Sequence, residues 1–281
     1  MNSVLVQELE RYNGLVSLIT SSLSELLKTL RGEQLASAAT EQLFGPVLLG
    51  EVPGRWLKVS YPSQRTLAGY IADLRRRLTT FESWVADGAP TVFWLPAFYS
   101  PQSFLTALLQ DHARRARIEI DRLTFSFEFA DKSPLDGDDG SAKAWRSLYP
   151  RSPSAGAYVT GLFLEGAAWR STEKCLGESV PGVLHSVMPV VHLRPTKLPN
   201  AADGGRPASG AHATSGAGAE SVSLAAYECP LYRTAARRGA LSTTGHSTNF
   251  VTYVPLAVGD RSAPHWTKRG VALLCALPTE H

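Results

Sequence analysis

The residues best suited to chemistry lie in one polar run, STTGHSTN, at positions 242–249. A serine hydrolase needs a hydroxyl beside a histidine, together with an acid that orients the histidine. Ser242 and Ser247 flank His246 here, and Glu228 and Asp260 are acids not far along the chain. However, Asn249 stands where the Gly-x-Ser-x-Gly turn of many hydrolases has its second glycine. Because a catalytic triad is a spatial arrangement, a Ser/His hydrolase that uses His246 stays open beside the alternatives of a hydrogen-bonded turn or an interface.

Two other kinds of site lack their sequence patterns. The closest approach to a phosphate-binding loop is GAYVTG at 156–161, but Leu162 and Phe163 follow it instead of the lysine and hydroxyl that neutralise phosphate and hold magnesium. The potential metal ligands nearest one another in the sequence are Cys229, His246, His265 and Cys275. They lack the short spacings of structural zinc sites. The sequence therefore predicts no cofactor and no metal in this chain, and no catalytic residue apart from the hydrolase alternative.

The composition is that of a globular protein. The 281 residues are 44% hydrophobic and 19% charged, which is enough apolar side chain for a sizeable core. The net charge of +3 is too small to indicate nucleic-acid binding. The three cysteines are far apart and odd in number, so a reducing compartment is expected. Without a secretory signal or an apolar run of about 20 residues, the sequence predicts a soluble intracellular protein that does not enter a membrane.

The first part of the chain has the periodicity of helices. Apolar residues from Leu9 to Leu30 recur at steps of three and four, which predicts a long helix over 4–31. We expect it to dock on a larger body, with a coiled coil as the alternative, because Gly14 and polar residues interrupt the pattern. Further helices are predicted over 32–43, over 63–87 and from the capping residue Ser100 onward. The arginine run 75–77 lies largely off the apolar face and is expected on the solvated surface.

The period changes to two in the run LTFSFEF, where Leu123 and three phenylalanines alternate with polar residues. Further strands are predicted over 157–164, 188–193, 227–232, 250–256 and 270–277. Helices followed by strands indicate an α+β fold, with an N-terminal helical part and then a small antiparallel β-barrel of about six strands. We therefore predict a helical subdomain over 1–118 and a barrel subdomain over 119–281, with flexible insertions near 131–154 and 197–223.

Segments throughout most of the sequence from Val52 onward carry a family resemblance. They include VPGRW at 52–56, FWLPAF at 93–98, PQSFLTALLQ at 101–110, CPLYRT at 229–234, RRGALSTTGHSTNF at 237–250 and HWTKRGVALLC at 265–275. In this order they resemble the C-terminal domain of dynein heavy chains, particularly those of axonemal dyneins. The run LSTTGHSTNF is long and specific. The sequence departs from the family pattern at Pro96 and Ala97, where the family usually has Ser-Gly.

The resemblance implies a fold and a role. In the family, a group of helices followed by a small antiparallel β-barrel lies across one face of the AAA+ ring, has no nucleotide site, and is thought to brace the ring and modulate ATP-driven stepping along microtubules. The chain is therefore expected to be a non-catalytic regulatory domain of a microtubule motor complex in the axoneme of a cilium or flagellum. ATP and magnesium would belong to the parent motor.

The resemblance also implies a partner. The apolar stripes Leu9–Leu30 and Leu67–Trp84 are expected to face the AAA+ ring of a dynein heavy chain. Docking would occur in cis if the chain is a fragment of a heavy chain, or in trans if it is encoded separately. The alternative is a free-standing adaptor that binds another heavy chain or an axonemal component.

Seven residues in the resembling segments are candidates for gripping the ring or for bracing the structure. They are Trp94, Phe98, Phe104, Arg237, Arg238, His246 and Asn249. The last four lie in the polar connection between the strand-like segments 227–233 and 250–254. We interpret this connection as a link between two strands of the barrel rather than as a site of chemistry.

Overall fold

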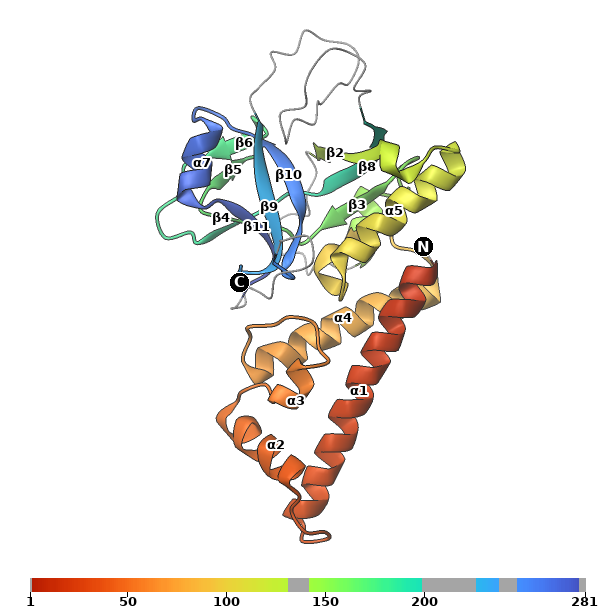
Figure 1. Cartoon of the computed structure of the whole chain (residues 1–281), viewed down its shortest axis with the longest axis vertical. Coiled ribbons are helices and arrows are strands. Elements are labelled where there is room, and N and C mark those ends of the chain that lie inside the picture. Colours follow the sequence, from red (N-terminus) through yellow and green to blue (C-terminus); the bar gives the residue numbers. More distant parts are fainter. Residues whose placement is uncertain (1, 131–141, 199–225, 238–246, 278–281) are drawn as a thin grey trace. The chain divides into compact units, whose positions relative to one another are not determined.

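The computed structural model describes residues 2–130, 142–198, 226–237 and 247–277 (Figure 1). The described residues form two compact units. The first unit comprises residues 2–88 with 97–99 and Leu277, and the second comprises residues 89–96 and the described residues between 100 and 276. None of the helices in the described part of the chain has the length and apolar character that a membrane crossing needs.

The first unit is helical. Its helices are α1 (Asn2–Leu30), α2 (Ala38–Leu49), α3 (Gly54–Leu57) and α4 (Leu67–Asp87). Side chains cap two of them, because Ser37 accepts a hydrogen bond from the Thr40 amide and Thr66 accepts one from the Gly69 amide. The long first helix is confirmed. The predicted short helix 32–43 is shifted, because Pro46 lies inside α2 without ending it, and the chain leaves the helix at Gly50, whose φ is 73°.

Polar groups are buried in the core of the first unit beside aromatic rings. The buried face of α1 includes Glu8, whose carboxylate accepts a hydrogen bond from the Tyr99 amide at 2.7 Å. The Tyr12 hydroxyl donates to the Ala97 carbonyl at 2.6 Å. These two bonds explain why residues 97–99 belong to this unit. The rings that surround Tyr12 within about 6 Å are Tyr61, Phe81 and Tyr99.

The second unit begins with α5 (Pro101–Ala116) and a four-stranded sheet. Ser100 accepts a hydrogen bond from the Ser103 amide and Pro101 is the first helical residue, as predicted. The sheet has the order β1-β3-β8-β2. Its strands are β1 (Val92–Trp94), β3 (Ala157–Thr160), β8 (Val191–Lys197) and β2 (Leu123–Phe129). Strands β2 and β8 pair antiparallel along their whole length, from Leu123 opposite Lys197 to Phe129 opposite Val191.

A seven-stranded sheet forms the rest of the second unit and closes almost into a barrel, because its two outermost strands, β5 and β7, approach each other. Its order is β5-β6-β10-β9-β11-β4-β7. The strands are β5 (Ala168–Arg170), β6 (Cys175–Gly177), β10 (Phe250–Ala257), β9 (Ala226–Thr234), β11 (Ala272–Ala276), β4 (Phe163–Glu165) and β7 (His185–Val187). Helix α7 (Ala263–Arg269) packs against β9, and the buried Trp266 indole donates to the Val258 carbonyl at 3.0 Å.

The α+β fold class is confirmed, with helices first and a barrel-like sheet after them. The sheets are mixed rather than wholly antiparallel, since the pairs β1–β3, β6–β10 and β9–β11 are parallel. Strand β11 becomes parallel to β9 because α7 carries the chain from β10 across to the other side of β9. The described strands outnumber the six expected, since the predicted strand 157–164 is divided into β3 and β4, and the three-residue strands β1, β5, β6 and β7 lie outside the predicted ranges.

The compact units do not divide the chain after residue 118. Helix α5 belongs to the second unit because it packs against β2, β8 and β10. The subdomain 1–118 as a docking module therefore stays a prediction. Of the expected insertions, residues 131–141 and 199–223 lie outside the described residues, whereas a short helix, α6 (Ala142–Leu148), occupies part of the range 131–154.

Candidate functional site

Asn249 braces the polar connection at its C-terminal end. Its side chain is buried, and the Nδ2 group donates to the Thr234 carbonyl at 3.1 Å, to the Thr234 hydroxyl at 3.0 Å and to the Ala236 carbonyl. The Arg233 amide donates to the Asn249 carbonyl at 2.9 Å. One amide side chain therefore joins the end of β9 to the start of β10, on either side of the connection.

Arg237 ties the other end of the connection to the sheet. Its guanidinium donates to the Gly270 carbonyl at 2.6 Å and to the Glu165 carboxylate on β4. Gly270 ends α7 with a φ of 67°, and a Cβ atom there would lie 3.3 Å from the Arg237 guanidinium. The second Glu165 oxygen lies 3.8 Å from His185. Arg237 thus connects β4, the end of α7 and the segment after β9.

The other two polar candidates, Arg238 and His246, lie outside the described residues. The hydrolase alternative that uses His246 is therefore untested by this structure. Asp260, one of the two acids named for it, is engaged elsewhere, because its carboxylate accepts a hydrogen bond from Arg170 at 2.7 Å. The hypothesis of a Ser/His hydrolase gains no support from the described residues.

The three aromatic candidates do not form one site. Phe98 is buried in the first unit, where its ring lies 5.7 Å from Phe81 in a T-shaped contact. Phe104 is fully buried in the second unit, 5.1 Å from Phe93. Trp94 on β1 is half-buried beside Gly161, where a Cβ atom would lie 2.5 Å from the indole. Phe98 and Phe104 therefore act as core residues rather than as surface contacts.

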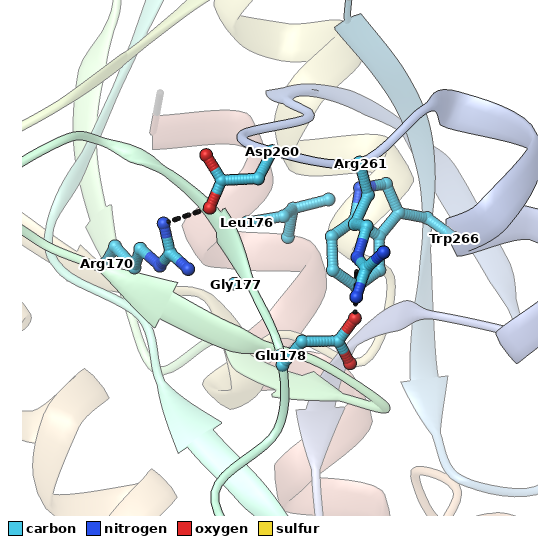
Figure 2. Close-up of a pocket in the computed structure, with 7 residues that line it drawn as sticks. All are labelled: Arg170, Leu176, Gly177, Glu178, Asp260, Arg261 and Trp266. Atoms are coloured by element: carbon cyan, nitrogen blue, oxygen red, sulfur yellow. Dashed lines mark hydrogen bonds and ion pairs between the residues drawn. The ribbon is translucent and has the colours of Figure 1, made fainter.

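A pocket of about 200 Å³ opens where β6, α7 and the segment before α7 meet (Figure 2). Leu176 and Trp266 supply apolar lining. Two ion pairs flank it, with Arg170 2.7 Å from Asp260 and Arg261 3.1 Å from Glu178. The remaining lining residue is Gly177, where a Cβ atom would lie 2.6 Å from Arg170 Nε. Each carboxylate accepts a charge-assisted hydrogen bond from a guanidinium.

Glu178 is the centre of the larger of these charge clusters. Arg261 and Arg269 donate to its carboxylate, and His265 Nε2 lies 3.3 Å from Oε1. Burial opposes ionisation, but the charges of Arg269 and Arg261 prevail and lower the pKa of Glu178 below its ordinary value. Sequence reasoning missed this cluster, since Glu178 is far along the chain from its partners. The basic residues in HWTKR at 265–269 were its only sequence clue.

The three cysteines are buried and form no disulfide bond with one another. Two of them, Cys175 and Cys229, are poor nucleophiles. Burial raises the pKa of Cys175 and, further, that of Cys229, so both thiols stay protonated at neutral pH. Within the described residues, no three His, Cys, Asp or Glu side chains are grouped so that they could hold a metal ion.

Residues 1–275 match the family described as the C-terminal domain of the dynein heavy chain. The protein belongs to this family. Dynein axonemal heavy chain 3 of Mus musculus is 41% identical over 277 residues, and dynein axonemal heavy chain 12 of Mus musculus is 40% identical over 278 residues. Dynein axonemal heavy chain 1 of Homo sapiens is 39% identical over 277 residues.

Each of these alignments covers 99% of the sequence but only 6% or 8% of the relative. The 281 residues thus correspond to a small part of a dynein heavy chain. The family resemblance drawn from the sequence is confirmed. In this dynein C-terminal domain, Arg237 and Asn249 stand at either end of the RRGALSTTGHSTNF run, and both hold main-chain carbonyl groups in place.

Proposed function

We propose that this protein is a regulatory C-terminal domain of an axonemal dynein heavy chain, which braces the AAA+ ring and modulates ATP-driven movement along microtubules in a cilium or flagellum. The match of residues 1–275 to the family carries the proposal. The axonemal names of the relatives at about 40% identity support the choice of motor class. ATP and magnesium then bind elsewhere in the parent motor.

The first unit carries an exposed apolar surface that fits a docking role. Most of the predicted stripes lie elsewhere, because Tyr12, Ile19 and Leu26 on α1 and Tyr70 and Trp84 on α4 are buried within the unit. Nine large apolar residues of the first 59 are exposed, and among them Leu30 alone belongs to a predicted stripe: Val6, Leu27, Leu30, Leu35, Phe44, Leu48, Leu49, Leu57 and Val59.

The most exposed of these gather in and around α2. Leu35 is 94% exposed, and Leu48 and Leu49 are 72% and 73% exposed. Helix α2 is apolar around most of its circumference, which is typical of a helix that is covered on more than one side. Exposed apolar residues in such number mark an interaction surface. We assign this α2 surface, defined by Leu35, Phe44, Leu48 and Leu49, to contact with the AAA+ ring.

A binding measurement tests the proposal. The probe is an axonemal dynein motor whose own C-terminal domain has been removed, and the chain is added in trans. We expect the chain to bind the motor and to change its ATPase rate and its speed of microtubule gliding. The double variant Leu48→Ser/Leu49→Ser should bind about tenfold more weakly or worse, since burying a leucine is worth about 1.5–3 kcal/mol. Tyr253→Ser, which changes an exposed aromatic residue of the second unit, is the matched control.

Two outcomes would count against the proposal. In one, the truncated motor does not bind the chain and its ATPase rate is unchanged. In the other, the chain binds equally well to an intact motor without displacing the resident C-terminal domain, which would instead support the free-standing adaptor.

A further inference from the structure

The segment that follows β6, together with the strand β7, exposes four aliphatic side chains. Val180, Val183, Leu184 and Val187 are 56%, 48%, 78% and 67% exposed. They lie within eight residues of one another in the second unit, whereas the α2 surface belongs to the first.

A tight turn presents these side chains. The Val183 amide donates to the Val180 carbonyl at 3.1 Å, and Pro181 and Gly182 occupy the two central positions. Gly182 has a φ of 82°, which the third position of a type II turn requires, and proline at the second position suits the same turn. Beyond the turn, β7 pairs with β4 and ends the seven-stranded sheet. The aliphatic residues are therefore held by a defined backbone.

Cations outnumber carboxylates beside this turn. Glu178 precedes it and is held by Arg261 and Arg269, and Arg269 also donates to the Ser179 hydroxyl at 3.0 Å. Lys268, next to Arg269 on α7, is exposed. Figure 2 shows Arg261 beside Glu178 at the pocket. Two permanent cations, Arg261 and Arg269, thus meet one carboxylate, and Arg261 itself is 55% exposed.

We propose that this surface, defined by Val180, Val183, Leu184, Val187, Arg261 and Arg269, binds an acidic, aliphatic segment of a partner protein. Aliphatic side chains of the segment cover Leu184 and Val187, and its carboxylates meet Arg261 and Arg269. Arginine suits this task because its guanidinium binds carboxylates through two parallel hydrogen bonds. The inference concerns the second unit and does not depend on the proposed function.

Two other occupants fit the surface less well. A second copy of the chain in a two-fold contact would bring the same cations against each other, which is unfavourable. A membrane surface favours tryptophan and tyrosine at its boundary, and this turn presents valine and leucine. The cation excess beside aliphatic residues matches a protein segment with carboxylates next to apolar side chains.

Selection from a library of random displayed peptides tests the inference on the intact chain. We expect the selected peptides to be enriched in Asp or Glu together with Leu, Ile or Val. A synthetic copy of the best peptide should bind more weakly as salt is raised. Its affinity should fall about tenfold or more when its acidic residues are changed to amides, because a loss of 1.4 kcal/mol is tenfold.

Variants of the chain place the binding site. Leu184→Ser/Val187→Ser should lose the peptide, and Arg261→Gln should weaken the acidic peptide but not its amide version. Tyr253→Ser is the control, and a circular dichroism spectrum like that of the original chain shows that each variant is folded. Selected peptides without acidic residues, or equal binding to the double serine variant, would overturn the inference. The inference would also be overturned if the original chain bound no peptide but bound phosphatidylserine vesicles or self-associated, and if the double serine variant lost that vesicle binding or self-association.

Discussion

Replacing Arg77 with methionine should destabilise the first unit strongly. Arg77 and its partner Asp73 are 3% and 6% exposed, and Nε lies 2.7 Å from the carboxylate. The guanidinium also lies 3.7 Å from the centre of the Tyr61 ring. Methionine keeps much of the apolar stem of arginine but leaves Asp73 buried without its main partner. The sequence pattern placed this residue with its neighbours on the solvated surface, which is wrong.

The magnitude follows from the burial of the pair. Removing one member of a buried ion pair costs about 3–5 kcal/mol, because the remaining charge is left without compensation. Arg65 lies 4.0 Å from the other Asp73 oxygen and is 20% exposed, so it compensates part of the charge. We therefore expect a loss near the lower end, about 3 kcal/mol. The double variant Asp73→Leu/Arg77→Met should recover most of this loss, since it removes both charges.

Urea unfolding monitored by hydrogen exchange of α1 and α4 peptides measures this effect in the first unit alone. Arg75→Met is the matched control, because Arg75 is exposed on the same helix and should change stability by less than about 0.5 kcal/mol. Equal losses for Arg77→Met and Arg75→Met would refute the reasoning. A double variant no more stable than Arg77→Met would contradict the assignment of the loss to an uncompensated charge.

Three further predictions concern other parts of the chain. Burial raises the pKa values of Tyr12, Tyr61 and Tyr99. Their stabilising effect is complete below the ordinary tyrosine pKa of about 10, and the free energy of unfolding should fall by about 1.4 kcal/mol per pH unit for each tyrosine as pH rises further. Tyrosinate absorbance should appear together with unfolding, and ionisation without unfolding would contradict this prediction. Asn249→Ala should lower the free energy of unfolding by about 1–3 kcal/mol, because the buried carbonyl and hydroxyl of Thr234 lose their donor. Denaturant titration measures this loss. A loss no larger than that of Ser247→Ala would count against the bracing role. Because the pKa of Glu178 is lowered, its ionised carboxylate stabilises the fold above about pH 4.3, and this effect should be lost as pH falls through the lowered pKa. The melting temperatures of the original chain and of Glu178→Gln should therefore converge in acid. A difference in melting temperature that stays constant down to low pH would contradict the role of the charge cluster.

Local sequence patterns correctly predicted those helices and strands whose boundaries depend on neighbouring residues. The Ser100 cap with Pro101 predicted the start of α5, and the alternation from Leu123 onward predicted β2. The α+β class followed from the change of period between these two elements. Sequence reasoning failed where the decision lies in distant contacts, as at β6, which pairs with β10, and at β7, which pairs with β4.

Buried charged residues were the other feature that sequence reasoning did not predict. An apolar stripe on α1 that contains Leu9 leaves out Glu8, although Glu8 is 1% exposed and Leu9 is not fully buried. The partner of Glu8 is the Tyr99 amide, 91 residues away, and no periodicity shows it. The spacing of Asp73 and Arg77, four residues apart on one helix, was a usable local clue to the second buried charge. The charge cluster at Glu178 had no comparable clue.

Hydrogen exchange of the chain with and without its partner tests the central claim most directly. The partner is the AAA+ ring of an axonemal dynein heavy chain from which the C-terminal domain has been removed. If the chain docks through the first unit, peptides that cover residues 27–35 and α2 should be protected when the ring is added, and Leu48→Ser/Leu49→Ser should remove that protection. Binding without protection anywhere in the first unit, or no binding at all, would contradict the claim.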